Sequence, residues 1–283
     1  MEINELKIFL AVARQGSISR AAEELNYVQS NVTTRIKQLE ERLGTALFYR
    51  KSKGVCLTAS GQTLRGYAER IVQLTREAHD ALSDDAVPQG PLAISSMETT
   101  AAVRLPGLLA DYHRRYPQVA LNLVTAPSSE SFKKLLDYQV EGAFVAGEIH
   151  QQSVEMRDVF EEELVLVAPQ ETDPLMMESL KILVFRSGCS YRACLESWLR
   201  QNGRLEYHSV ELGSIEGIIA CVGAGMGISI LPRSVVDRPH LIQNCTVHEL
   251  PEPVARMTTR FIWRRHEKAS SALQAFRDLL PAP

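Results

Sequence analysis

The spacing of apolar residues changes near residue 85, and this change constrains the fold more than any other feature. Residues 1–85 show almost only the spacing of amphipathic helices, whereas from Pro91 onward short apolar runs alternate with helical stretches. Between these parts, residues 83–91 contain two prolines, a glycine and two aspartates, which is typical of a linker after a helix. We therefore predict a helical N-terminal part followed by an α/β part.

Composition narrows the classes of protein that fit. With 283 residues, of which 45% are hydrophobic and 23% charged, the chain has the values of a globular protein with two domains. The formal net charge of −3 excludes a globally basic protein, so contacts with nucleic acid would need a local basic patch. The N-terminus lacks the pattern of a signal peptide and no apolar run is long enough to cross a bilayer. We therefore expect a cytoplasmic protein with no membrane partner.

Residue types that often carry catalytic or metal chemistry show no matching pattern. The five cysteines are widely spaced without a CxxC pair, and the seven histidines lack metal-ligand spacing. No GxSxG motif or phosphate-binding loop is present. The glycine-rich run 223–227 follows a predicted helix, so we interpret it as a tight return with close packing. We expect no enzyme activity, no metal and no cofactor.

The first 43 residues predict a helix-turn-helix. Leu6 and Phe9 share one face of a first helix that ends at Gly16, and a short second helix follows. A third helix, over residues 28–43, buries Val32 and its neighbours one and two turns on. Short hydrogen-bonding side chains near the start of this helix can bond to base edges in a major groove. The basic side chains nearer its end can contact phosphates. Its outward side carries the candidate DNA contacts Gln29, Ser30, Asn31, Thr33, Thr34, Arg35 and Lys37.

The segment 47–58 predicts two short strands around a basic turn, which is a wing. Residues 35–53 contain six basic side chains against Glu40 and Glu41, whereas residues 1–85 as a whole contain twelve basic and eleven acidic ones. Positive charge is thus concentrated on the third helix and the wing, where it favours contact with phosphates. The wing adds the candidate DNA contacts Arg50, Lys51, Lys53 and Thr58.

A long helical stretch follows Ser60 and continues to about Leu82. Its apolar residues alternate between spacings of four and three over nearly three heptads, which indicates a helix that pairs with a second copy. We consider packing against the chain's own core the weaker alternative. The candidate dimerisation residues are Leu64, Tyr67, Ile71, Leu74 and Ala78.

Four segments resemble the winged helix-turn-helix of LysR-type transcriptional regulators. They are Phe9–Leu25, Arg35–Gly44, Leu47–Arg50 and Leu57–Gly61. The resemblance is dense over about the first 65 residues and looser beyond them. One departure stands out: the family often begins this helix with Ser-Gln-Pro, and here Val28 occupies the position of the serine. We expect Ser30 or Asn26 to cap the helix instead.

This resemblance implies the organisation of the whole chain. Residues 1–60 would form the all-α winged helix-turn-helix, 61–90 the dimerisation helix and hinge, and 91–283 a two-lobed α/β effector-binding domain like the periplasmic binding proteins. The first lobe would comprise about 91–161 and 265–283, and the second about 162–264. The implied partners are double-stranded operator DNA, a small-molecule effector, further copies in a homodimer or homotetramer, and RNA polymerase.

Within the second part, strand and helix patterns alternate. This alternation predicts parallel sheets covered by helices. We expect strands near 92–96, 119–124, 143–146, 162–168, 182–185, 228–231 and 258–264, and helices over 99–116, 131–138, 191–201, 215–224 and 270–280.

Three predicted strand-to-helix turns, at 96–100, 186–191 and 213–216, are rich in serine, threonine and glycine. Helix N-termini after parallel strands face one crevice, where free N–H groups attract anions. A carboxylate there would repel an anion or prefer an amino group, so the ligand's charge stays open. The candidate effector-binding residues are Glu98, Thr99, Thr100, Gly147, Ser190, Ser214 and Ile215.

Two alternatives to a ligand-controlled regulator remain. Cys189 precedes a predicted helix, where a thiolate would be favoured, so the chain could be a redox-sensing regulator. It could also be a two-lobed solute-binding protein or enzyme without DNA function, although such a protein would not need residues 1–85. A structural nucleoid protein would not need the second part. We interpret the chain as a ligand-responsive, sequence-specific DNA-binding regulator.

Overall fold

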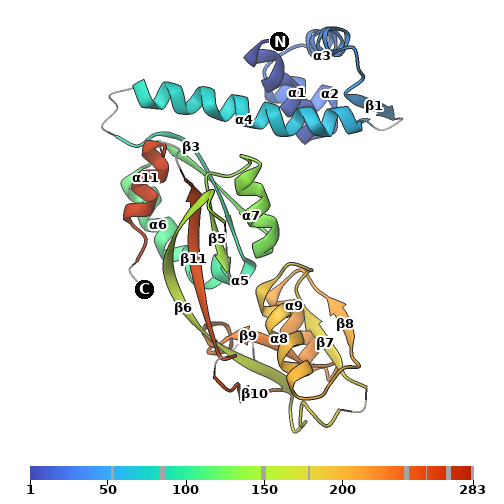
Figure 1. Cartoon of the computed structure of the whole chain (residues 1–283), viewed down its shortest axis with the longest axis vertical. Coiled ribbons are helices and arrows are strands. Elements are labelled where there is room, and N and C mark those ends of the chain that lie inside the picture. Colours follow the sequence, from blue (N-terminus) through green and yellow to red (C-terminus); the bar gives the residue numbers. More distant parts are fainter. Residues whose placement is uncertain are drawn as a thin grey trace. The chain divides into compact units, whose positions relative to one another are not determined.

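The computed structural model describes residues 1–51, 54–82, 87–147, 151–177, 179–238, 242–252, 254–265 and 269–281 (Figure 1). The chain forms two compact units, one built on Met1–Asp85 and one that holds most of the remaining chain. Each unit has its own apolar core. Within these ranges, no helix has the length and apolarity needed to span a membrane.

The first unit is the winged helix-turn-helix that the sequence predicts. It comprises α1 (Ile3–Gln15), α2 (Ile18–Glu24), α3 (Gln29–Leu43), the antiparallel pair β1 (Phe48–Lys51) and β2 (Gly54–Leu57), and α4 (Ala59–Leu82). Phe9, Val12 and Leu39 are fully buried in its core. Ser17 caps α2 by accepting a hydrogen bond from the backbone N–H of Arg20.

The wing is held against the end of α1 by the backbone. The N–H of Val55 donates to the carbonyl of Gly16 at 2.9 Å. A Cβ at Gly54 would lie 2.3 Å from that same carbonyl oxygen, and the φ of Gly54 is 118°. Only glycine fits this position without displacing the wing.

The N-terminus of α3 differs from expectation, because no side chain caps it. Val28 is the residue that precedes the helix, and neither Asn26 nor Ser30 makes a capping hydrogen bond there. Asn26 instead has a φ of 54°, which turns the chain between α2 and α3. The helix therefore begins without the hydroxyl or amide cap that most helices use.

The apolar residues of α4 divide into two sets, which corrects the single seam predicted from the sequence. Leu64 and Ile71 are half-buried and pack against the core of the first unit, beside the fully buried Ala68. Tyr67 and Leu74 are 60% and 52% exposed, respectively. Packing against the chain's own core, the weaker alternative in the sequence analysis, thus accounts for Leu64 and Ile71, two of the five candidate dimerisation residues.

The second unit contains two lobes joined by long strands. The first lobe contains β3 (Gly90–Ser96), α5 (Glu98–Val103), α6 (Leu105–Arg115), β4 (Val119–Thr125), α7 (Ser128–Leu136), β5 (Gly142–Ala146) and α11 (Ser271–Asp278). The second lobe contains β7 (Lys181–Val184), α8 (Ser190–Gln201), β8 (His208–Glu211), α9 (Ile215–Gly223), β9 (Ser229–Pro232), α10 (Arg233–Val236) and β10 (Cys245–Glu249). The strands β6 (Val154–Pro169) and β11 (Arg256–Arg264) connect them (Figure 1).

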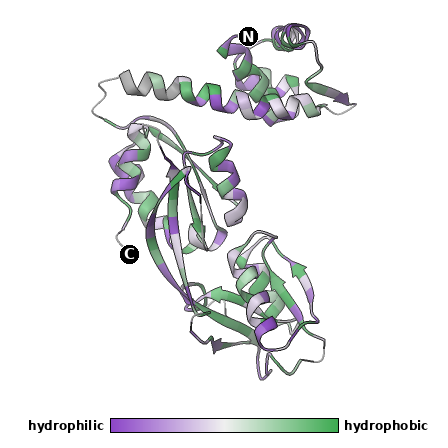
Figure 2. Cartoon of the chain, viewed as in Figure 1, coloured by the Kyte–Doolittle hydropathy of each residue, from purple (hydrophilic) through white to green (hydrophobic). Residues whose placement is uncertain are grey.

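The sheet is mixed rather than parallel throughout. Its order is β10-β6-β11-β5-β3-β4, with β9 also paired to β6. The β3–β4 and β3–β5 pairs are parallel, but β11 pairs antiparallel with both β5 and β6, because the chain returns from the second lobe in the opposite direction. In Figure 2 the central strands of both lobes are mostly hydrophobic, in keeping with their burial.

Two expected boundaries in this unit are wrong. The predicted helix over 99–116 is two helices, α5 and α6, broken at Arg104, since Pro106 in the first turn of α6 cannot donate a backbone hydrogen bond to the preceding turn. The second lobe does not extend to residue 264. Phe261 and Trp263 pair with β5 and lie in the core of the first lobe, so the chain returns within β11.

The glycine-rich run 223–227 packs closely, as predicted. A Cβ at Gly227 would lie 2.1 Å from the carbonyl oxygen of Lys181, and one at Gly223 would lie 2.5 Å from that of Gln243. The run therefore lets α9 and β9 approach neighbouring backbone.

Candidate DNA-binding surface and effector cavity

The exposed side of α3 carries most of the predicted DNA contacts. Gln29, Ser30, Thr34 and Lys37 are exposed, whereas Thr33 is half-buried. The hydroxyls of Thr33 and Thr34 donate to the carbonyls of Gln29 and Ser30, one turn back, at 2.9 Å in each case. Each hydroxyl thus retains acceptor capacity, and each side chain retains a methyl group for apolar contact.

Two further predicted contacts on α3 are bonded to each other. The Nε of Arg35 donates to the Oδ1 of Asn31 at 3.0 Å, and both side chains are half-buried. Reading adenine by an asparagine needs its oxygen and its nitrogen together. The bond to Arg35 uses one of the two lone pairs of this oxygen and neither hydrogen of the amide nitrogen, so it orients Asn31 and leaves it able to read a base.

Charged groups at the end of α3 hold the first unit together. Arg42 pairs with the buried carboxylate of Glu5 at 2.9 Å, and the carboxylate of Glu40 accepts from the backbone N–H groups of Leu47 and Phe48. The backbone N–H of Glu2 lowers the pKa of Glu5 most strongly, and Arg42 adds to this effect. These groups fix α3 against α1 and the wing.

On the wing, Arg50 and Lys51 are exposed and make no ion pair with any residue that the structure describes. They are therefore the cations freest to contact phosphates. Lys53 lies outside the described residues. Thr58 is buried: its hydroxyl donates to the carbonyl of Ala46 at 2.7 Å and accepts from the N–H of Gly61 at 2.9 Å. It caps α4, so its place among the DNA contacts is corrected.

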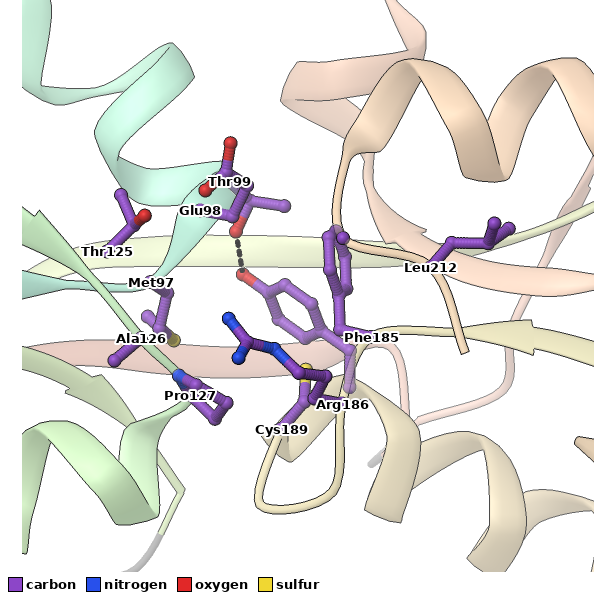
Figure 3. A pocket seen from close by; sticks show the side chains of 12 residues that line it. Met97, Glu98, Thr99, Thr125, Ala126, Pro127, Phe185, Arg186, Cys189 and Leu212 are labelled. Atoms are coloured by element: carbon purple, nitrogen blue, oxygen red, sulfur yellow. Dashed lines mark hydrogen bonds between the residues drawn. The ribbon is translucent and has the colours of Figure 1, made fainter. Parts of the chain in front are cut away.

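In the second unit, a cavity of about 50 Å³ lies between the two lobes (Figure 3). We call it the interlobe cavity. From the first lobe it is lined by Met97, Glu98, Thr99, Thr125, Ala126 and Pro127, and from the second by Phe185, Arg186, Cys189, Tyr191, Leu212 and Gly213. These residues lie at strand ends and helix starts, which is where the sequence places the crevice.

Across this cavity, one hydrogen bond already joins the lobes. The hydroxyl of Thr99 donates to the phenol oxygen of Tyr191 at 3.2 Å, marked by the dashed line in Figure 3. Burial raises the pKa of Tyr191 well above its ordinary value, so this phenol stays neutral. The bond holds Thr99 of the first lobe next to Tyr191 of the second.

The interlobe cavity contains one charged group from each lobe. Glu98, half-buried, comes from the start of α5, and Arg186, exposed, follows β7. Neither is paired with a described residue. Around them, Met97, Phe185 and Leu212 give apolar walls. The cavity thus offers a carboxylate, a guanidinium and apolar surface to one small molecule.

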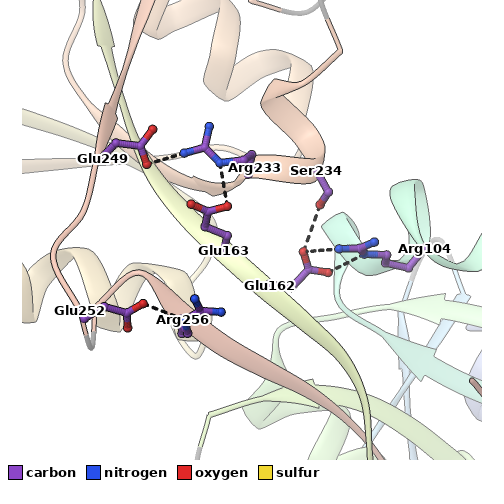
Figure 4. Close-up of polar contacts among 8 residues, drawn as sticks. All are labelled: Arg104, Glu162, Glu163, Arg233, Ser234, Glu249, Glu252 and Arg256. Carbon is purple, nitrogen blue, oxygen red and sulfur yellow. Dashed lines mark hydrogen bonds and ion pairs between the residues drawn. The ribbon is translucent and has the colours of Figure 1, made fainter. Parts of the chain in front are cut away.

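Beside the cavity, a buried ion pair connects the lobes (Figure 4). Arg104, between α5 and α6, binds both carboxylate oxygens of Glu162 on β6, at 2.8 and 2.9 Å. The hydroxyl of Ser234 on α10 donates to the same carboxylate at 3.1 Å. On the outer side of β6, Arg233 pairs with Glu163 and Glu249. The α5–α6 junction is therefore fastened to β6 and to the second lobe.

Comparisons with known proteins agree with this architecture. Residues 3–62 match the family "Bacterial regulatory helix-turn-helix protein, lysR family", and residues 85–282 match "LysR substrate binding domain". The chain belongs to the LysR family of transcriptional regulators. As a member of that family it is a DNA-binding transcriptional regulator with an effector-binding domain, and not an enzyme.

Relatives of this LysR regulator match along nearly the whole chain. The HTH-type transcriptional regulator GltR of Bacillus subtilis (strain 168) is 44% identical over 281 residues, which are 98% of this chain and 95% of GltR. The uncharacterized HTH-type transcriptional regulator YusT of the same organism is 46% identical over 279 residues, 98% of this chain and 95% of YusT.

Solved structures share the fold. A full-length OxyR variant from Pseudomonas aeruginosa has a TM-score of 0.75 at 22% identity, covering 99% of this chain and 94% of that chain. Full-length CbnR, solved with its target DNA, has a TM-score of 0.69 at 23% identity, covering 99% of both chains. Because the chain belongs to the LysR family of transcriptional regulators, the alternative of a solute-binding protein or enzyme without DNA function is wrong.

The structure of this LysR regulator separates the predicted effector residues into three groups. Glu98 and Thr99 line the interlobe cavity, and Gly147 and Ser190 line a second cavity of about 560 Å³. Ser190 donates to the carbonyl of Ala146 at 2.6 Å, so its hydroxyl already joins the lobes. The residues Thr100, Ser214 and Ile215 line neither cavity.

Each member of the third group has another environment. Thr100 is 2% exposed inside α5 and its hydroxyl has no hydrogen-bond partner. Ser214 caps α9 by accepting from the N–H of Gly217 at 3.1 Å, and Ile215 lies in the core of the second lobe. The sequence predicts the start of α9 after Ser214 correctly. It places the start of the earlier helix, at Thr99 or Thr100, too late, since α5 begins at Glu98 and the preceding Met97 has no capping side chain.

Sequence reasoning missed Arg186, Phe185, Tyr191 and Leu212 as individual cavity residues. The signal for Arg186 was available, since it is the first cation after a buried strand in one of the three predicted turns. The apolar members carry no such signal, because a cavity wall and a core have the same sequence pattern.

The pKa of Cys189 does not favour the redox alternative. Burial raises the pKa of this thiol, and backbone N–H groups of α8 only partly oppose that effect. The cysteine is therefore less ionised than an ordinary one, contrary to the expected effect of the helix N-terminus. All five cysteines are free thiols.

Proposed function

We propose that a small molecule binds in the interlobe cavity and thereby changes the affinity of the winged helix-turn-helix for a specific operator sequence. One observation carries this proposal: both lobes contribute unpaired charged groups and apolar walls to the same cavity. A ligand that contacts both lobes binds with an affinity that depends on the angle between them. Such differential affinity is what shifts a conformational equilibrium.

The charges indicate the chemistry of this effector. A carboxylate at Glu98 favours a cationic group, and a guanidinium at Arg186 favours a carboxylate or phosphate. The apolar side chains of Met97, Phe185 and Leu212 favour a hydrocarbon part between them. We propose a small zwitterionic organic molecule, of which an amino acid is the simplest kind.

We further propose that two copies act together through α4. The exposed Tyr67 and Leu74 lie seven residues apart, on one face of a helix, and neither side chain is buried in the first unit. A dimer would present two α3 helices and two wings to a two-fold related operator. A cytoplasmic protein bound in this way at a promoter would also be placed to contact RNA polymerase.

The cavity is tested by filling it. Gly213 lines the interlobe cavity and a Cβ there meets no atom within 4 Å, so the backbone has room for Gly213→Trp, whose ring we expect to obstruct the cavity. Gly107 in α6 has the same free space and does not line the cavity, so Gly107→Trp is the matched control. Operator DNA is first selected from random sequences with the wild-type protein.

The measurement is operator affinity with and without the low-molecular-weight fraction of a cell extract, followed by the twenty amino acids one by one. We expect a change in affinity for the wild type and Gly107→Trp, and none for Gly213→Trp, which should still bind the operator. An equal response of both variants would place the effector site elsewhere.

A further inference from the structure

Val28 is the most exposed of the large apolar side chains that the structure describes in the first unit, at 70%. It precedes α3 directly, with φ −75° and ψ 142°, and its carbonyl accepts the first hydrogen bonds of the helix. It therefore occupies the position at which serine, threonine, asparagine or aspartate normally caps a helix.

This choice of residue is unfavourable for the helix itself. A valine at the capping position costs about 1 kcal/mol relative to a capping side chain, and no neighbouring side chain substitutes for it. The exposed isopropyl group also gains little from burial. Single exposed apolar residues are common and need no explanation by themselves. Here, however, exposure coincides with a lost cap at the tip of the recognition helix.

The surroundings of Val28 define what it meets on DNA. The N-terminal residues of a recognition helix contact base edges in the major groove. At this end of α3, Gln29 and Ser30 are exposed and their side chains make no hydrogen bond to the rest of the described chain, whereas the hydroxyl of Thr33 is directed to the helix backbone. Hydrogen-bonding groups at the tip therefore lie next to one apolar group.

In the major groove, the apolar feature of a base pair is the 5-methyl group of thymine. We propose that Val28 packs against the methyl group of a thymine in each operator half-site and sets the preference for thymine at that position. The loss of the cap is then the consequence of placing an apolar side chain where the helix enters the groove.

The test uses deoxyuridine, which keeps every hydrogen-bonding group of thymine and lacks only the methyl group. Each thymine of a selected operator is replaced singly, and affinity is measured by fluorescence anisotropy with the full chain. Wild-type protein should lose about fourfold in affinity at one thymine per half-site, the factor that corresponds to one buried methyl group.

Val28→Ser should bind the thymine and deoxyuridine operators equally well, and Val28→Ala should show an intermediate ratio. The serine can cap α3, so the thermal stability of Val28→Ser should equal or exceed that of the wild type, which separates lost contact from lost folding. Leu43→Ser removes a 40% exposed apolar side chain at the other end of α3 and should keep the full discrimination.

Two results would overturn the proposal. If no thymine shows a loss on replacement by deoxyuridine, the protein reads no methyl group. If a loss appears but persists unchanged in Val28→Ser, the methyl group is read by another residue, such as Thr33 or Thr34. Both outcomes leave the proposed effector site in the second unit untouched.

Discussion

The ion pair between Arg104 and Glu162 offers a quantitative test of how the lobes are joined. The carboxylate of Glu162 is 3% exposed and is bound by both guanidinium nitrogens and by Ser234, while the side chain of Arg104 is 33% exposed. Removing one partner of a buried pair leaves an uncompensated charge and costs about 3–5 kcal/mol. Because Arg104 is partly exposed, we take the lower end of that range.

We therefore expect Arg104→Met to destabilise the second unit by about 3 kcal/mol, which corresponds to a fall in Tm of roughly 6–12 °C for a unit of this size. Ser234→Ala, which removes one neutral donor, should cost about 1 kcal/mol. The double variant Arg104→Met with Glu162→Leu replaces the pair by apolar groups and should recover most of the loss.

The assay is urea denaturation of the full chain followed by tryptophan fluorescence. The two tryptophans, Trp198 and Trp263, both belong to the second unit, one to each lobe, so the signal reports this unit alone. The reasoning is refuted if Arg104→Met costs less than about 1 kcal/mol, or if the double variant is destabilised by the sum of the single losses.

Four further outcomes follow from the structure. Arg50→Ala should reduce the slope of log affinity against log salt by about 0.9 for each subunit, on cognate and random DNA alike; an unchanged slope in an anisotropy titration would exclude a phosphate contact. Tyr67→Glu combined with Leu74→Glu should shift the sedimenting species to the monomer while circular dichroism stays that of the wild type, and an unchanged oligomer would remove α4 from the interface. The pKa of Glu5 is lowered in the folded state, so its contribution to stability is full above the ordinary value of 4.5 and is lost as the pH falls through the folded pKa. In thermal melts, Glu5→Gln should therefore be less stable than the wild type at pH 7 and equal to it in acid. Alkylation of Cys189 by iodoacetamide, read by peptide mass spectrometry, should still be rising at pH 9, whereas a plateau below pH 7 would revive the redox reading.

How far the sequence predicts this molecule depends on the range of the interactions involved. The helix-turn-helix, the wing and the start of α9 at Ser214 follow from local spacing, glycine positions and capping residues, which act within a few residues. The return of β11 into the first lobe and the pairing of β6 with three strands, β9, β10 and β11, depend on contacts between distant segments, which local patterns do not contain.

The candidate site shows the same limit. An apolar run predicts the strand before Glu98, so the sequence places Glu98 at a strand end and therefore in the cavity. The same argument places Thr100, two residues later, in the cavity as well, and the sequence does not distinguish the two. Thr99 and Thr100 are equally buried, at 2% exposure, but Glu98 and Thr99 line the cavity and Thr100 does not. Successive residues of a helix point in different directions, and the sequence does not show which of them faces the cavity.

The helix α5 is where the proposed effector and the interlobe ion pair meet. Its first residue, Glu98, lines the cavity, and the residue after its end, Arg104, is held by Glu162 and through it by Ser234 of the second lobe. If the proposed effector binds at Glu98, we expect any movement of this short helix either to carry Arg104 with it or to break the bidentate pair, and breaking the pair costs about 3 kcal/mol. We therefore expect the ion pair to couple the proposed effector at Glu98 to the arrangement of the two lobes, so Arg104→Met should alter the response to the effector even where it leaves operator binding without effector unchanged.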